Sequence, residues 1–145
     1  MACGASALHA QVPPSPAEKA AYTGLLAAAA KGDAAQIKAL AAKGGKPDVR
    51  DGTQRTPLHV AAYGAHHEAM RALVAAGADP NALERDRYDI VTIAAVANDV
   101  PTLKALVDAR ANLNLADRNG ETPLALAKAR RYGAMVKLLE QAGAR

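Results

Sequence analysis

The sequence RTPLHVAAYGAHHEAMRALVAAGADPNA, at residues 55–82, decides the fold because parts of it recur along the chain. The segment TPLHVAA begins at Thr56, and TPLALAK begins at Thr122, which is 66 positions or twice 33 later. DIVTIAA stands half-way between them at Asp89, and TGLLAAA stands 33 positions before the first at Thr23. A fixed period of this length is typical of stacked-repeat proteins. Four units are therefore predicted from Thr23 to the end of the chain.

Each unit is predicted to hold two short helices. Thr56 and Thr122 each precede a proline, which places a capping hydroxyl and a fixed φ at the start of the first helix. Asp33 and Asp99 are expected to cap second helices in the same way. Glycine follows three of the second helices and Arg110 takes that place in the third, at a cost of about 1 kcal/mol relative to glycine. The second helices are predicted in the segments IKALAAKGG, MRALVAAGA, LKALVDARA and VKLLEQAGA, which start at Ile37, Met70, Leu103 and Val136.

These motifs resemble the ankyrin repeat. TPLHVAA, AGADPNA at residues 76–82 and DRNGETPL from Asp117 are similar to the family's pattern, in register across the units. The resemblance implies an all-α solenoid of stacked antiparallel helix pairs with projecting hairpin-like loops. It implies one domain over residues 17–145, with repeats at about 17–55, 56–88, 89–121 and 122–145.

The third and fourth units depart from the pattern in different ways. Asp89 and the three residues after it replace Thr, Pro, Leu and His, and Arg87 stands where a loop glycine is expected. This puts the tightness of the third unit's first turn in doubt. In the fourth unit, Lys128 and Glu140 replace residues that are apolar in every earlier unit, as expected of a repeat with no neighbour beyond it. At the other end, AEKAAY before Thr23 is expected to extend the first helix.

Composition and charge argue against several classes of protein. The 145 residues include no Trp, no Phe and four Tyr, and the 50% hydrophobic share comes mostly from small side chains that suit close helix packing. The net charge of +4 comes from 18 basic and 14 acidic residues that are mixed along the chain, so we expect no nucleic-acid partner. Cys3 is the single cysteine, so neither an intrachain disulfide nor a thiolate metal cluster is possible. The longest apolar runs are too short to span a membrane.

Residues 1–16 differ from the rest of the chain. Small residues followed by Pro13, Pro14 and Pro16 are typical of a flexible leader and an extended linker. ASALHA before Gln11 also fits the cleavage region of a trimmed secretory signal, although the charged and apolar parts of such a signal are absent. Both interpretations stay open. The first places the protein in the cytoplasm and the second in the periplasm of a bacterium.

The histidines of residues 55–82 raise the question of an active site. His59 lies near Thr56 and His66 lies near Glu68, as a catalytic or metal-binding group would require. The ankyrin resemblance instead implies that His59 ties the turn together and that His66 is structural, which leaves His67 as a solvated residue. The sequence also lacks a phosphate-binding glycine loop, a nucleophile elbow and an HExxH helix. We therefore expect no catalytic residue, no metal and no cofactor.

The remaining candidates are surface positions that the repeat pattern leaves variable. Tyr and Arg are enriched at binding hot spots because they combine apolar area with hydrogen-bonding groups. Carried over from the ankyrin pattern, the expected partner-binding residues lie in the loops and at the ends of first helices: Arg55, Tyr63, Arg85, Asp86, Tyr88, Val96, Arg118, Asn119 and Arg130.

The sequence thus predicts a non-catalytic, monomeric interaction module. It is expected to bind another protein through its loop tips and concave face. An alternative hypothesis, based on the leader and on the alanine-rich composition, is a bacterial envelope protein that protects or scaffolds another enzyme.

Overall fold

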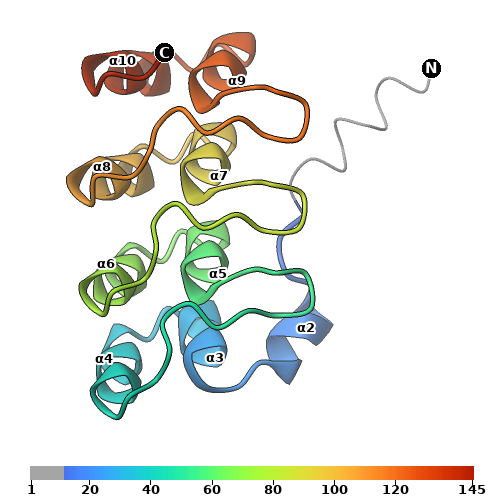
Figure 1. Ribbon diagram of the computed structural model, residues 1–145, viewed down its shortest axis with the longest axis vertical. Helices are drawn as coiled ribbons and strands as arrows, with labels where there is room; N and C mark the ends of the chain where they lie inside the picture. The colour runs from blue at the N-terminus through green and yellow to red at the C-terminus, as the bar shows by residue number, and fades with distance from the viewer. Residues whose placement is uncertain (1–11) are drawn as a thin grey trace.

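The computed structural model describes residues 12–145, which form nine helices and no strand. The helices follow one another in pairs that stack along one axis (Figure 1). They are α2 (Pro16–Ala21), α3 (Gly24–Lys31), α4 (Ala34–Ala42), α5 (Pro57–Tyr63), α6 (His67–Ala75), α7 (Ile90–Val96), α8 (Val100–Asp108), α9 (Pro123–Ala129) and α10 (Gly133–Gln141).

The stack has an inner and an outer column of helices. The first helices of the pairs, α3, α5, α7 and α9, form the inner column, and α4, α6, α8 and α10 form the outer one (Figure 1). The loops between pairs project beyond the inner column, all on the same side. The predicted all-α solenoid is therefore confirmed, including the third pair, α7 and α8.

The helix starts explain why each pair forms where it does. Thr56 and His59 make a capping box at α5, in which each side chain bonds the other residue's backbone N–H. Asp89 replaces the threonine at α7, and its carboxylate accepts a hydrogen bond of 3.0 Å from the Thr92 backbone. A short acceptor at the N-cap is enough to start the helix. The altered third unit thus keeps its first helix because aspartate caps as threonine does.

The first, second and third projecting loops lie between α4 and α5, between α6 and α7, and between α8 and α9, and they share one hairpin. In each, a backbone N–H donates to the carbonyl four residues later, as from Asp51 to Arg55 at 3.0 Å. The turn places Gln54, Arg87 and Gly120 in the left-handed region, with φ of 64°, 64° and 79°. Only the last is glycine, so the absence of glycine at Arg87 does not change the turn. Its backbone N–H still donates to the Glu84 carbonyl at 2.9 Å.

The core consists mainly of small and aliphatic side chains between the two columns. All residues of α5 except Tyr63 are buried, because α3 and α7 cover it on both sides and α6 covers its outer face. In α9, by contrast, Ala125, Lys128 and Ala129 are exposed. Lys128 forms an exposed ion pair of 3.0 Å with Glu140 of α10. The charged residues of the fourth unit therefore lie on the outer end of the stack, as predicted.

The segment before Thr23 forms a separate helix. The expected extension of the first helix is wrong, because Tyr22 has extended backbone, with φ −66° and ψ 146°, between α2 and α3. Its hydroxyl donates to the Asp51 carboxylate at 2.6 Å. Residues 12–15, part of the expected linker, precede α2 and lie against the first two loops (Figure 1).

Candidate protein-interaction surface

The second and third loops carry the most accessible candidate residues. Arg85, Arg118 and Asn119 are exposed, and Asp86 is half-buried. The Arg118 guanidinium donates to the Asp86 carboxylate at 2.7 Å, which links the two loop tips. Arg85 is linked to the first loop, because its guanidinium donates to the Gly52 carbonyl and its backbone N–H donates to the Thr53 carbonyl. These bonds join three adjacent loops and hold the charged side chains of the second and third loops.

The candidates on the inner helices are less accessible. Val96 ends α7 and Arg130 caps the C-terminus of α9, and both are half-buried. Tyr63, the last residue of α5, is also half-buried, and its hydroxyl donates to Glu84 Oε1 at 3.0 Å. The inner helices therefore continue the loop surface, although with smaller accessible areas.

Arg55 and Tyr88 differ from the other candidates because both are buried. Arg55 has 3% of its surface exposed and Tyr88 has 2%. The Tyr88 side chain belongs to the hydrophobic core, and its carbonyl accepts from the His59 ring. A partner cannot reach either side chain in this arrangement. The sequence could not show this because the register fixes a position in the loop, whereas burial depends on what packs against it.

Arg55 is the centre of a buried charged cluster. Its Nη1 lies 3.1 Å from Asp51 Oδ2 and 3.1 Å from Glu18 Oε1. Its Nη2 donates to the Val12 carbonyl at 2.9 Å, and its Nε lies 3.8 Å from Glu84 Oε2. One cation therefore holds carboxylates from α2 and from two different loops.

The carboxylates of this cluster have different proton affinities. Burial favours the neutral form of Asp51, but hydrogen bonds from Tyr22 and from the backbone of Arg55 and Thr53 outweigh it and lower its pKa to about 2. For Glu84, burial dominates over the bond from Tyr63 and the charge of Arg55, and raises its pKa to about 7. Asp51 is therefore a fixed anion, whereas Glu84 changes charge near neutral pH.

Asp51, Glu84 and Glu18 were missed as members of this cluster. A signal was present for two of them, since Asp51 and Glu84 occupy one register position, and Asp117 is the third member of that series. Asp51 and Asp117 accept backbone N–H groups of their own loops. Glu84 has one more methylene and instead reaches Tyr63 and Arg55. No register relates Glu18 to the loops, so its contact required the folded chain.

The histidines have structural contacts. His59 is fully buried, and its Nδ1 accepts from the Thr56 backbone at 3.2 Å, which leaves Nε2 to donate to the Tyr88 carbonyl at 3.1 Å. Burial lowers its pKa to about 4, so it is neutral at pH 7. The His66 ring lies against Gly32 and Gly64, where an added Cβ would come within 2.6 Å of ring nitrogens. His67 is not simply solvated, because its Nε2 lies 3.2 Å from Asp99 Oδ1.

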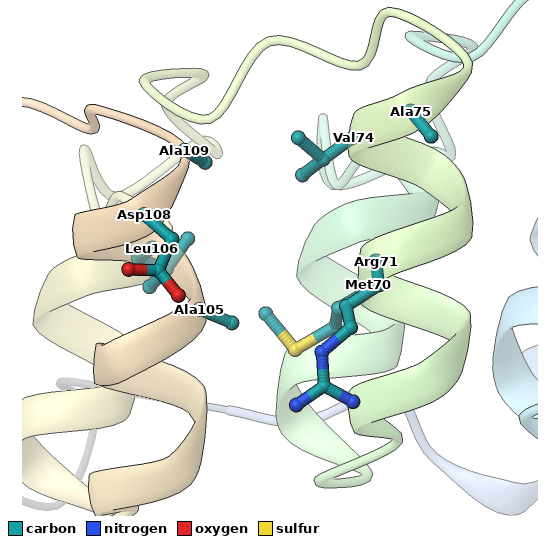
Figure 2. Close-up of a pocket in the computed structure, with 8 residues that line it drawn as sticks. All are labelled: Met70, Arg71, Val74, Ala75, Ala105, Leu106, Asp108 and Ala109. Carbon is teal, nitrogen blue, oxygen red and sulfur yellow. The ribbon is translucent and has the colours of Figure 1, made fainter.

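A hollow lies on the side opposite the loops, between the outer helices α6 and α8 (Figure 2). It has a volume of about 270 Å³. Its lining is mostly apolar, with Met70 and Leu106 at its base and Arg71 and Asp108 at its margin. None of the candidate residues lies there, so the hollow is separate from the loop surface.

No cluster of three or more potential metal ligands occurs among the described residues. Within the same part of the chain, no helix has the length and hydrophobicity needed to cross a membrane. The possible cleavage region at residues 5–10 lies outside the described residues.

Comparison with known families defines the class of protein as a helical repeat array. A family model described as ankyrin repeats in three copies matches residues 4–84, which is more than half of the chain. A second model, described as ankyrin repeats in many copies, matches residues 91–140. The chain therefore belongs to the ankyrin repeat family, whose domains are generally protein-interaction modules. No curated protein matches the chain.

Proposed function

We propose that the protein is a non-catalytic binding module that holds another protein against the tips of its second and third loops and the adjoining ends of its inner helices. The observation that carries this proposal is the row of polar groups on these two loops, of which Arg85, Arg118 and Asn119 are exposed and Asp86 is half-buried. Arg85 and Arg118 provide long side chains with several donors, as binding hot spots commonly do. Tyr63, Val96 and Arg130 extend this surface, whereas Arg55 and Tyr88 support it from within.

The loops are suited to binding because they are held before a partner arrives. Each has the same backbone hairpin, and side-chain or backbone bonds join the first loop to the second and the second to the third. Groups that are already ordered lose less conformational entropy on binding. A partner that presents carboxylates and carbonyl oxygens would therefore meet donors in fixed positions.

The test is the capture of partners from a lysate of the source organism by the immobilised chain and by two matched variants. Arg85→Ala with Arg118→Ala removes two cations from the loop tips. Lys38→Ala with Lys104→Ala removes two exposed cations from the outer helices α4 and α8. Proteins held by the native chain and by the outer-helix variant, but lost with the loop variant, support the proposal. Equal capture by all three forms would contradict it.

A further inference from the structure

Residues 12–18 cover part of the surface that the first two loops form. Residues 12–15 precede α2 and run beside the first two loops, and residues 16–18 form the first turn of α2 (Figure 1). Arg55 donates through Nη2 to the Val12 carbonyl at 2.9 Å and through Nη1 to Glu18 at 3.1 Å. Pro14 is buried between these two contacts. A backbone carbonyl and a carboxylate of one short segment thus occupy the two terminal nitrogens of one buried guanidinium.

The segment has the features of a peptide ligand with low conformational entropy. Its three prolines restrict the backbone, and Ser15 is extended, with φ −67° and ψ 162°. Ser15 and Glu18 form a capping box, in which the Glu18 carboxylate accepts the Ser15 backbone N–H at 2.7 Å. This bond fixes one oxygen of Glu18 and leaves the other for Arg55.

Residues 12–18 make few enough contacts with the domain that a competing peptide can replace them. Val12 has 52% of its surface exposed, and Ser15, Pro16 and Ala17 are also exposed. Beside the segment lies a hollow of about 220 Å³, lined by Val12, Glu18, Thr53, Arg55, Glu84, Arg85 and Asp86. Most of these lining residues carry hydrogen-bonding side chains. A competing peptide therefore has room next to the segment, with the exposed guanidinium of Arg85 at the rim.

From these contacts we propose that the cleft at Arg55 is a peptide-binding site, and that residues 12–18 are its resident intramolecular ligand. The partner is a protein segment that is extended at its start, begins a helix as residues 12–18 do, and carries one carboxylate, which takes the position of Glu18. Release of residues 12–18 exposes Arg55 between Asp51 and Glu84, while the bond from Tyr22 to Asp51 keeps the following residues on the domain. This inference rests on the proposed function, because it names the chemistry of the partner for part of the same face.

The attachment of residues 12–18 to the domain determines how strongly they should compete with a free peptide. A segment joined through a short linker has an effective concentration on the order of 1 mM. If the free peptide binds with a Kd of about 0.1 mM, the attached segment weakens its binding to the complete chain about tenfold. A lost charge-assisted bond to Arg55 is expected to weaken the peptide by a similar factor.

The experiment measures fluorescence anisotropy of a labelled peptide, VPPSPAE with an amidated C-terminus, with the complete chain and with a variant of residues 19–145. We expect saturable binding to the shortened variant and binding at least tenfold weaker to the complete chain. The peptide with Glu18→Gln should bind the shortened variant about tenfold more weakly. Arg55→Lys in that variant should reduce binding, whereas Lys104→Ala on the outer helix α8 should leave it unchanged. No saturable binding to a folded shortened variant, or equal affinity for both peptides, would overturn the proposal.

A second variant covers the case in which the shortened chain does not fold. In it, residues 12–18 are replaced by a Gly-Ser segment of equal length, and helical circular dichroism and cooperative unfolding are recorded for both variants. If neither folds, the segment is an integral part of the stack, and the proposed exchange is wrong. The peptide titration is independent of any natural partner. Its failure is therefore distinguishable from a failure of the loop-tip variant to lose captured proteins.

Discussion

One position recurs in the three successive loops, and it is occupied by Arg55, Tyr88 and Glu121, each 33 residues from the next. The surroundings of these three side chains differ. Arg55 is covered by residues 12–18 and holds three carboxylates, whereas Tyr88 is enclosed in the hydrophobic core. Glu121 is exposed. The loop backbone is the same in all three. A shared position in the repeat therefore fixes the path of the chain but not the exposure of the side chain.

The largest effect within this comparison is expected at Tyr88. Tyr88→Ala removes a ring that is 2% exposed and leaves a cavity between repeats, so the free energy of unfolding should fall by about 4 kcal/mol. Urea denaturation followed by circular dichroism measures the change. Tyr88→Phe keeps the ring and should cost less than about 1 kcal/mol. A small loss for Tyr88→Ala would mean that this ring does not join the repeats.

Arg55 should give the next largest effect. Arg55→Ala leaves the buried carboxylates of Asp51 and Glu84 without their cation, which should lower the free energy of unfolding by about 3 kcal/mol. Arg118→Ala is the matched control, because its ion pair with Asp86 is largely exposed and should contribute less than about 1 kcal/mol. Equal losses in the two variants would show that the covering segment does not make Arg55 a buried residue in solution.

Glu84 should give the folded protein a pH-dependent stability. Burial raises the pKa of Glu84 from 4.5 to about 7, so its stabilising contribution is present below pH 4.5 and is lost as the pH rises through 7. The difference in unfolding free energy between Glu84→Gln and the native chain should therefore increase by about 2 kcal/mol from pH 4.5 to 7. Burial lowers the pKa of His59 to about 4, so its contribution to the free energy of unfolding increases with pH. This contribution is the same in both proteins and therefore cancels in the difference. A constant difference across this range would rule out a buried, titrating Glu84.

The smallest effect is expected at Glu121. Its side chain is exposed, so Glu121→Ala should change the free energy of unfolding by less than about 0.5 kcal/mol. The same urea titration serves as the measurement. A loss comparable to that of Arg55→Ala would remove the distinction between the two positions.

The fold could be predicted from the sequence because each repeat carries local signals for the starts of its helices. Thr56 and Thr122 cap their inner helices as expected, Asp89 does the same in the altered third unit, and the 33-residue period places the three helices in one column. Even the left-handed turn at Arg87 follows from the loop's hydrogen bonds rather than from glycine. Local capping and a regular period are sufficient for a fold in which each unit packs only on its neighbours.

The candidate surface was less predictable, because accessibility depends on contacts between segments far apart in the chain. Arg85, Arg118 and Asn119 are exposed, as a binding residue must be. The burial of Arg55 depends partly on Val12 and Glu18, which precede the first repeat and follow no period. The role of Glu84 depends on one additional methylene, which carries its carboxylate to Tyr63 and Arg55. Such contacts arise from packing and leave no pattern in the repeat.

The proposed function assigns partner binding to the exposed loop-tip cations rather than to charge in general. Its most direct test is the Kd of a captured partner, measured by biolayer interferometry at fixed salt for the native chain and the two double variants. The Arg85→Ala, Arg118→Ala variant should bind at least tenfold more weakly, and the Lys38→Ala, Lys104→Ala variant should bind within twofold of the native chain. An unchanged Kd for the loop variant, or an equal loss in both variants, would contradict the claim.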